Sequence, residues 1–83
     1  MSAPLFVLAT ITAKPNHARQ VREAIHSALA PTRAENGCDR YDLLSDNNND
    51  HRFVLQEEWR SKAALKAHFL TEHFKTLLSA FRH

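Results

Sequence analysis

The sequence lacks the features of a secreted, membrane-spanning or disulfide-stabilised protein. Its 83 residues include a single cysteine, Cys38, so no disulfide can form within the chain. No apolar stretch approaches the ~18 residues that a membrane span requires. The apolar stretch near the N-terminus has no positively charged segment before it, so we expect a strand there and not a signal peptide. We therefore expect a cytoplasmic protein that does not act at a membrane.

The charge pattern argues against nucleic-acid binding, and the scarcity of glycine argues against two common kinds of catalytic loop. The chain has 11 lysines and arginines and 9 aspartates and glutamates, for a net charge of +2, and the two signs alternate along it. Nucleic-acid binding favours a basic stripe interleaved with aromatic residues, and because this pattern is absent we expect no nucleic-acid partner. The only glycine is Gly37, so the sequence has no glycine-rich phosphate loop and no nucleophile elbow.

The chain length predicts a single domain, 1–83, with a small core. A domain of this size buries roughly 60–65% of the surface that its unfolded chain exposes. Yet 43% of the residues are hydrophobic, which is typical of a globular protein. A partner subunit would cover the surplus apolar surface, so we expect a homo-oligomer, most simply a homodimer.

Hydrophobic patterning predicts three strands, at residues 5–14, 38–45 and 51–59. The residues between the second and third strands, 46–50, are all aspartate or asparagine, which favours a tight turn and an antiparallel hairpin. With one helix before the hairpin and one after it, the order is β-α-β-β-α. The sequence therefore predicts an α+β fold with an antiparallel sheet.

Helix boundaries follow from capping residues. Asn16 is a suitable N-cap for the first helix, and Pro31 should end or kink that helix. Gly37 then follows where a left-handed cap is needed. Ser61 can cap the second helix, and Thr71 interrupts its apolar stripe, so we expect the second helix in two pieces.

The stretch 52–75 carries the candidate catalytic residues. Glu57 and Trp59 lie on the third strand, while His68 and His73 lie on the second helix, at a spacing that can bring all four near one pocket. Because imidazole titrates near neutral pH, His68 is the best candidate base. The alternative for His68 is a hydrogen-bonded core residue, since it shares an apolar helix face.

Glu57 has two interpretations. Strand alternation places it on the same face as Phe53 and Trp59, among apolar neighbours. Burial without a partner would raise its pKa and allow it to act as a general base. Because buried charges are usually paired, the alternative is a structural ion pair with Arg40 or Arg52 across the hairpin.

The other candidates are also open to two interpretations. Trp59 could stack on an aromatic substrate or close the end of the core, and Tyr41 could reach the pocket rim or pack. His73 falls in the first turn of the second helical piece, where the helix dipole favours neutral imidazole, so it could line the pocket or pack and cap. His68 and His73 are five residues apart and no cysteine or carboxylate completes a ligand set, so we expect no metal site.

The sequence resembles the antibiotic biosynthesis monooxygenase domain of the dimeric α+β barrel superfamily. The residues that carry the resemblance are Phe6–Pro15, Pro31–Cys38, Tyr41, Phe53-x-x-x-Glu57-x-Trp59 and His68-x-x-x-x-His73-Phe74. It implies a ferredoxin-like subunit, a sheet that packs on the sheet of a second subunit, and a pocket between sheet and helices in each subunit. Family oxygenases use no metal, flavin or haem, so the resemblance implies no cofactor.

The resemblance also implies a set of site residues. His68 and Glu57 are the candidate catalytic residues. The candidate substrate-binding residues are Trp59, His73, Tyr41, Phe53 and Arg40.

Two departures from the family pattern bear on function. The family usually adds a strand after the second helix, whereas this sequence ends at His83, so we expect an extra open sheet edge that a partner subunit would cover. Haem-degrading members rely on an asparagine in the opening strand, and residues 5–13 contain none. Haem degradation is therefore disfavoured.

Three functional hypotheses follow. The first is a cofactor-independent monooxygenase that removes a phenolic proton from a quinol or polyhydroxylated aromatic compound, whose anion reacts directly with O₂. The second is processing of a small phosphorylated signal molecule, for which Arg33, Arg40 and Arg52 are the candidate anion-binding groups. The third is a non-enzymatic, dimeric binding or stress-response protein. A closed apolar pocket containing His68 would favour the monooxygenase. An arginine-lined cleft would favour the phosphorylated ligand, and a pocket filled by its own side chains would favour the non-enzymatic protein.

Overall fold

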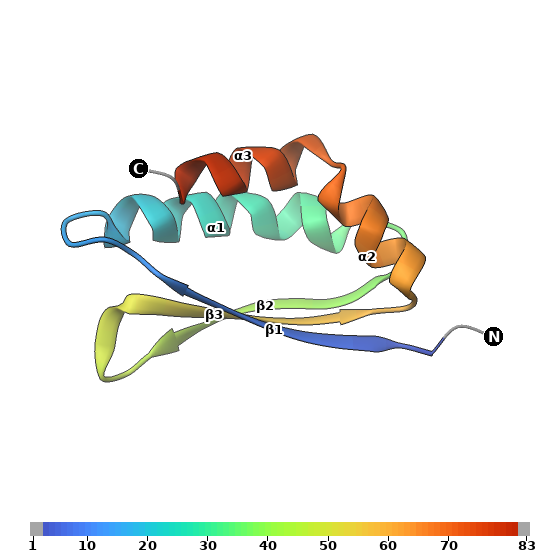
Figure 1. The fold of residues 1–83 in the computed structure, drawn as a ribbon, viewed down its shortest axis with the longest axis horizontal. Helices are drawn as coiled ribbons and strands as arrows, with labels where there is room; N and C mark the ends of the chain where they lie inside the picture. Colours follow the sequence, from blue (N-terminus) through green and yellow to red (C-terminus); the bar gives the residue numbers. More distant parts are fainter. Residues whose placement is uncertain (1–2, 82–83) are drawn as a thin grey trace.

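The computed structural model describes residues 3–81, which form a three-stranded sheet with helices on one side (Figure 1). The elements are β1 (Leu5–Thr12), α1 (Ala18–Arg33), β2 (Cys38–Asp46), β3 (Asn49–Trp59), α2 (Lys62–Phe69) and α3 (Glu72–Ala80). The predicted order, with the second helix in two pieces, is confirmed. None of the helices in this part of the chain combines the length and apolar character that crossing a membrane requires.

The strands pair antiparallel in the order β1-β3-β2, so β3 is the central strand. Val7 on β1 and Tyr41 on β2 both pair with Glu57, and these three residues form one row across the sheet. The hairpin turn is only two residues long, and the backbone N–H of Asn48 donates to Oδ1 of Asp46 at 2.8 Å. The short turn lets both hairpin strands extend beyond their predicted ends.

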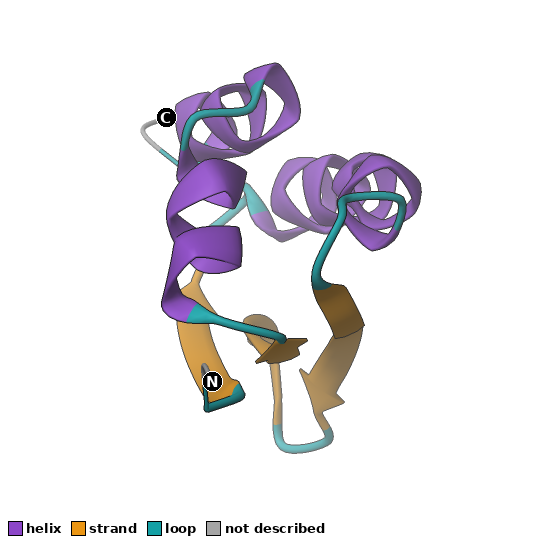
Figure 2. Ribbon diagram, turned by 90° about the vertical axis from the view of Figure 1, so that its right-hand side faces the viewer, coloured by secondary structure: helices purple, strands orange, loops and turns teal. Residues whose placement is uncertain are grey.

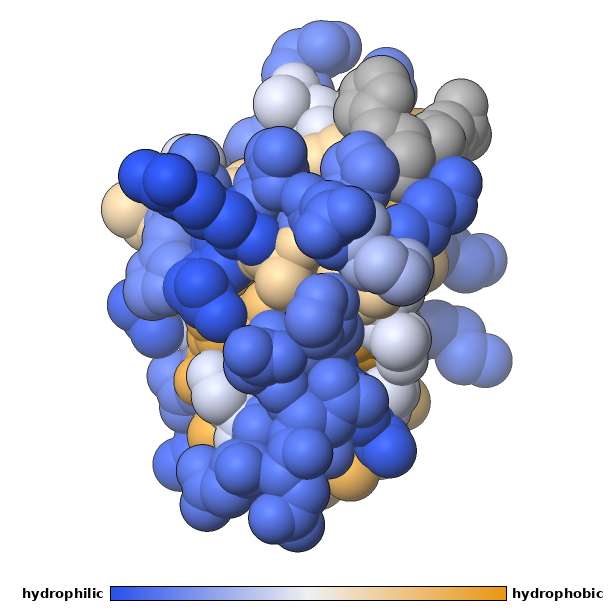
Figure 3. All heavy atoms as spheres, turned by 90° about the vertical axis from the view of Figure 1, so that its left-hand side faces the viewer, coloured by the Kyte–Doolittle hydropathy of each residue, from blue (hydrophilic) through white to orange (hydrophobic). Residues whose placement is uncertain are grey.

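The two faces of the sheet differ in what covers them. One face packs beneath the helices (Figure 2), and its alternate residues form the core. The fully buried core side chains include Ile25, Tyr41, Phe53 and Trp59. The other face carries no helix, and Phe6 and Leu8 on β1 are 73% and 71% exposed there. The end of the molecule seen in Figure 3 presents mainly hydrophilic side chains, with hydrophobic ones showing in the gaps between them.

Helix α1 begins one residue later than its predicted cap implies. Its N-cap is His17, not Asn16, because Asn16 takes a left-handed backbone conformation (φ 71°) that asparagine tolerates. Pro31 does not end the helix, which continues to Arg33. Gly37 has φ 92°, and a Cβ there would lie 2.6 Å from Cβ of Ala64, so this turn requires glycine both for its backbone and for space.

The break between α2 and α3 follows from their caps. The Ser61 hydroxyl accepts the backbone N–H of Ala64 at 3.2 Å, which confirms the predicted cap of α2. The Thr71 hydroxyl accepts the backbone N–H of Phe74 at 3.2 Å and donates to the carbonyl of His68 at 2.8 Å. Thr71 thus ends one helix and starts the next. This arrangement leaves His68 near the end of α2 and His73 at the start of α3.

Candidate active site

A cavity of about 260 Å³ lies between the sheet and helices α2 and α3. Its apolar wall includes Val7, Ala9, Ile11, Leu65, Leu77 and Leu78. The polar side chains in the wall are Tyr41, Glu57 and His68, so the structure brings three of the predicted site residues to one cavity. Such a wall suits a mostly apolar molecule with a few polar groups.

His68 is held firmly in this wall. Its side chain is almost fully buried, and its ring centroid lies 4.7 Å from that of Trp59 and 4.9 Å from that of Phe74. Its Nδ1 lies 2.7 Å from Oε2 of Glu35. An ionised carboxylate can only accept, so Nδ1 carries the proton in this contact. In neutral His68, Nε2 is then the nitrogen with a free lone pair.

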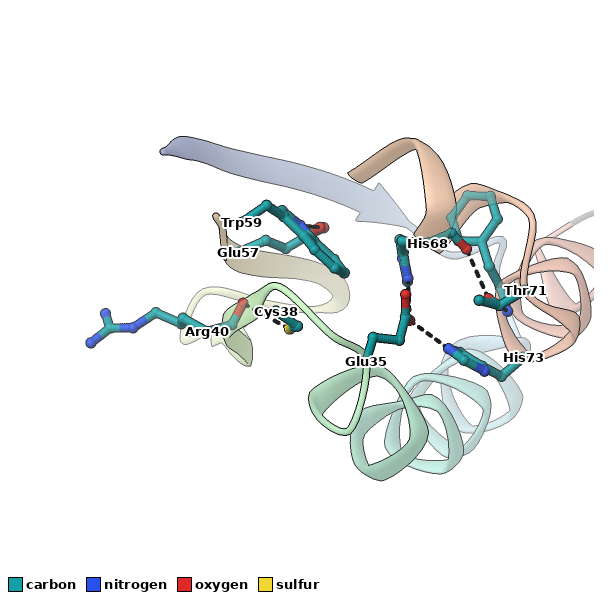
Figure 4. A network of polar contacts seen from close by, with 9 residues as sticks. Glu35, Cys38, Arg40, Glu57, Trp59, His68, Thr71 and His73 are labelled. Atoms are coloured by element: carbon teal, nitrogen blue, oxygen red, sulfur yellow. Dashed lines mark hydrogen bonds and ion pairs between the residues drawn. The ribbon is translucent and has the colours of Figure 1, made fainter. Parts of the chain in front are cut away.

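Glu35, in the turn after α1, accepts from two imidazoles at once (Figure 4). Nε2 of His73 lies 2.6 Å from the same oxygen that contacts His68. Among residues 3–81, no lysine or arginine forms an ion pair with Glu35. The two histidines are therefore the partners that satisfy this carboxylate, and it fixes the orientation of both rings.

Glu57 is buried beside Trp59. Its Oε1 accepts a hydrogen bond from the indole Nε1 of Trp59 at 2.9 Å. Burial raises the pKa of Glu57 above its ordinary value, and this effect exceeds the opposing effects of the Trp59 hydrogen bond and the nearby His68. The carboxyl group can therefore hold or receive a proton more readily than an exposed glutamate.

The predicted alternative for Glu57, an ion pair across the hairpin, is wrong. Arg40 lies 3.7 Å from Asp42, and Arg52 lies 4.0 Å from Asp46. The physical reason is strand alternation: Arg40 pairs with Glu58, the neighbour of Glu57, so both lie on the face of the sheet that has no helix.

Tyr41 is the third polar residue in the cavity wall. Its ring is almost fully buried and meets the His68 ring edge-on, at a centroid separation of 5.7 Å. Burial raises the pKa of the Tyr41 phenol, and the nearby Glu57 raises it further. The phenol therefore keeps its proton and can donate a hydrogen bond.

The other predicted site residues do not line this cavity. Trp59 is fully buried behind the wall, where it packs on His68, so the structure shows its packing role. His73 is tied to Glu35. Phe53 and Arg40 do not line this cavity either, and their roles in substrate binding stay predictions. Phe53 is buried in the core on the same face of the sheet as Glu57, whereas Arg40 lies on the opposite face.

The sequence analysis missed Glu35. No local signal marks it, because its partners lie 33 and 38 residues further along the chain. The argument that no carboxylate joins the two histidines was therefore wrong. The ligand atoms of Glu35, His68 and His73 all lie within 4.8 Å of one another, a grouping that could hold a metal ion.

Comparison with related sequences gives one family. The sequence pattern described as antibiotic biosynthesis monooxygenase matches residues 4–79. YcnE of Bacillus subtilis, provisionally named a monooxygenase, is 35% identical over 79 residues, which cover 87% of this chain and 83% of YcnE. The uncharacterised protein sll1783 of Synechocystis is 34% identical over 71 residues, or 86% of this chain and 48% of sll1783. The chain thus spans about half the length of that relative.

Solved structures share the fold. PA3566 of Pseudomonas aeruginosa has a TM-score of 0.87 and 48% identity, over 90% of this chain and 76% of PA3566. Rv0793 of Mycobacterium tuberculosis, which is also provisionally named a monooxygenase, has a TM-score of 0.90 and 30% identity, over 96% of this chain and 81% of Rv0793. The predicted ferredoxin-like α+β fold is confirmed.

Proposed function

The chain belongs to the antibiotic biosynthesis monooxygenase family, and from this premise we propose that it oxygenates a quinol or polyhydroxylated aromatic compound. The substrate loses a phenolic proton, and its anion passes electrons directly to O₂, without a metal, flavin or haem. One oxygen atom enters the ring and the other leaves as water. A hydroquinone supplies all four electrons for this reduction and becomes a hydroxyquinone. The family and its provisionally named monooxygenases support the general activity.

The observation that carries the proposal is the Glu35–His68 contact at the cavity wall, at 2.7 Å. With its Nδ1–H bonded to Glu35, His68 accepts the phenolic proton at Nε2 and acts as general base. The imidazolium that forms is stabilised by the negative charge of Glu35. Glu35 does not line the cavity, so it is a positioning residue.

Glu57 and Tyr41 have complementary roles in this proposal. The Tyr41 phenol, which keeps its proton, donates a hydrogen bond to the oxyanion that forms on the substrate. Glu57 has a raised pKa and can receive the second phenolic proton. Because the two residues face each other across paired strands, they can contact neighbouring oxygens of one ring.

The shape of the cavity favours this reading over the two alternatives. A cavity of about 150 Å³ holds benzene, so a cavity of about 260 Å³ has room for a substituted ring and is not filled by its own side chains. Among the described residues, no arginine lines it. Arg33 and Arg40 instead lie at a separate hollow with Asp42, whose carboxylate contacts both. Within residues 3–81, a phosphorylated ligand would therefore find no arginine in this cavity, and Asp42 already neutralises charge at the separate hollow.

We also propose that a second copy of the chain covers the face of the sheet that has no helix. Phe6 and Leu8 expose most of their surface there, and Leu44 is 45% exposed. Exposed apolar groups gathered on one face indicate a contact surface. Light scattering after gel filtration should give a dimer, which Leu8→Glu should dissociate. A wild-type monomer at high concentration would refute this part of the proposal.

Oxygen uptake with a panel of dihydroxyaromatic compounds tests the activity. We expect wild-type turnover above the uncatalysed autoxidation rate, with one atom of ¹⁸O₂ incorporated per product. His68→Ala should reduce the rate by ~10²-fold or more. His26→Ala, which alters an exposed histidine on α1, is the matched control and should leave the rate unchanged. Uptake at the autoxidation rate by the wild-type protein, or an equal rate in His68→Ala, would refute the proposal.

A further inference from the structure

We propose that Glu35, His68 and His73 form a binding site for a divalent transition-metal ion, with Zn²⁺ as the representative ion. The site goes beyond the proposed oxygenase, whose chemistry uses no metal. Its three side chains come from three elements: the turn after α1, the end of α2 and the start of α3. They supply one carboxylate oxygen and two imidazole nitrogens, all within 4.8 Å of one another.

Two of the three separations between ligand atoms are close to those of a tetrahedral site with one open position. Zinc bonds to nitrogen and oxygen of about 2.0–2.2 Å separate neighbouring ligand atoms by about 3.3 Å in a tetrahedron. The oxygen of Glu35 now lies 2.7 Å from His68 Nδ1 and 2.6 Å from His73 Nε2. Each contact therefore has to open by about 0.6 Å, a movement that side-chain rotation can supply. The fourth position is then left for water or another ligand.

The donor set and its charge favour transition metals. Two imidazoles and one carboxylate suit Zn²⁺, Co²⁺, Ni²⁺ and Cu²⁺, whereas Mg²⁺ prefers oxygen ligands. In the described part of the chain, Glu35 has no lysine or arginine partner, so its negative charge is available to a cation. A bound ion would replace the two hydrogen bonds with three coordination bonds, one to each of the three ligand atoms.

The surroundings fix the ligands and still allow entry. His68 is held by the rings of Trp59 and Phe74, and its backbone carbonyl accepts the Thr71 hydroxyl at 2.8 Å. Such support preserves ligand orientation, which strengthens metal binding. The side chains of Glu35 and His73 are 12% and 24% exposed, which gives an ion a path from solvent.

Metal binding and the proposed base catalysis require His68 to carry its proton on different ring nitrogens. An ion on Nδ1 takes the lone pair of that nitrogen, so the neutral ring carries its proton on Nε2. In that state Nε2 cannot accept a phenolic proton. The metal-free protein, with Nδ1–H bonded to Glu35, is the state that the oxygenase proposal requires.

Titration calorimetry of tag-free, full-length protein with ZnCl₂ tests the site, with MgCl₂ as the comparison ion. We expect one Zn²⁺ per chain and at least ~100-fold weaker binding of Mg²⁺. His73→Gln should weaken Zn²⁺ binding by at least ~10-fold. This side chain is partly exposed and lies outside the cavity, so the variant should fold. His26→Gln, which alters an exposed histidine on α1, should bind as the wild type does.

Cobalt gives a second readout that depends on coordination alone. Co²⁺ in the wild-type protein should show the visible absorption of a four-coordinate site, and His73→Gln and Glu35→Gln should both lose it. No stoichiometric Zn²⁺ binding by the wild type, or the same affinity in His73→Gln, would overturn the proposal. These measurements involve neither substrate nor O₂. Failure of the metal site would therefore leave the oxygenase proposal intact, and failure of oxygen uptake would leave the metal site intact.

Discussion

Two carboxylates of the candidate site, Glu35 in the turn after α1 and Glu57 on β3, carry the same group in different surroundings. Glu35 accepts from two imidazoles, at 2.7 and 2.6 Å, while Glu57 accepts from one indole, at 2.9 Å. The imidazoles can become cations that balance the charge of Glu35, whereas the indole of Trp59 is always neutral. Burial raises the pKa of Glu57, and the Trp59 hydrogen bond and the nearby His68 offset this effect only in part.

This difference assigns separate tasks to the two groups. A carboxylate that accepts the Nδ1–H of an imidazole holds that ring in one orientation and leaves Nε2 free to accept a proton. A carboxyl with a raised pKa in an apolar wall can exchange a proton with a bound ligand. Glu35 is thus suited to support His68 from outside the cavity, while Glu57 meets the cavity directly. Substituting each carboxylate by its amide tests this division.

The largest expected effect is on turnover in Glu35→Gln. The amide keeps the shape of the side chain but removes the charge that stabilises the protonated His68. We expect kcat for oxygen uptake to fall by ~10²-fold or more, with KM almost unchanged because Glu35 does not line the cavity. Glu57→Gln should change both parameters, since Glu57 does line it. A larger kcat loss in Glu57→Gln than in Glu35→Gln would contradict this assignment, because Glu57 would then contribute more to proton transfer than Glu35 does.

Much of the framework around these carboxylates was predictable because it depends on local sequence. Ser61 caps α2 as expected, since a cap needs only its own side chain and the next backbone N–H groups, and Thr71 interrupts the second helix as expected. Strand alternation placed Glu57 and Trp59 on one face, which the structure confirms. These predictions involve neighbours within a few residues.

The remaining features could not be read from sequence because they depend on distant contacts. Glu35 meets its histidines only because α1 ends beside the break between α2 and α3. Alternation gave the correct face for Phe53 but could not show that its pairing partner Ile11, and not Phe53 itself, lines the cavity. Asn16 had two local options, a cap or a left-handed turn, and its pattern did not distinguish them.

The next effect is on stability in Glu35→Leu. This change leaves the Nδ1–H of buried His68 without an acceptor and removes the partner of His73. We expect the free energy of unfolding to fall by about 2 kcal/mol or more, measured by urea denaturation. Trp59→Phe removes the donor to Glu57 and part of the ring that packs on His68, so it should also destabilise the protein and raise the pKa of Glu57 further. Unchanged stability in Glu35→Leu would mean that water satisfies both imidazoles.

A smaller effect is expected in the pH dependence of stability. The pKa of Glu57 in the folded protein is raised above its ordinary value of 4.5. Its contribution is therefore fully present below that value and is lost as the pH rises through the folded pKa. Compared with Glu57→Gln, the wild-type protein should lose stability in urea unfolding as the pH rises above the ordinary pKa of 4.5. A constant difference between the two proteins as the pH rises would contradict the raised pKa.

The smallest effect should come from a third carboxylate, Glu23 on α1, which serves as the reference for both. Its contact with Arg19 at 3.3 Å is a surface pair, with side chains 68% and 85% exposed. Water screens such pairs, so Glu23→Gln should change the free energy of unfolding by no more than about 0.5 kcal/mol and leave oxygen uptake unchanged. If Glu23→Gln cost as much as either buried substitution, removal of negative charge from the whole chain would explain the losses. The distinction between Glu35 and Glu57 would then have no local basis.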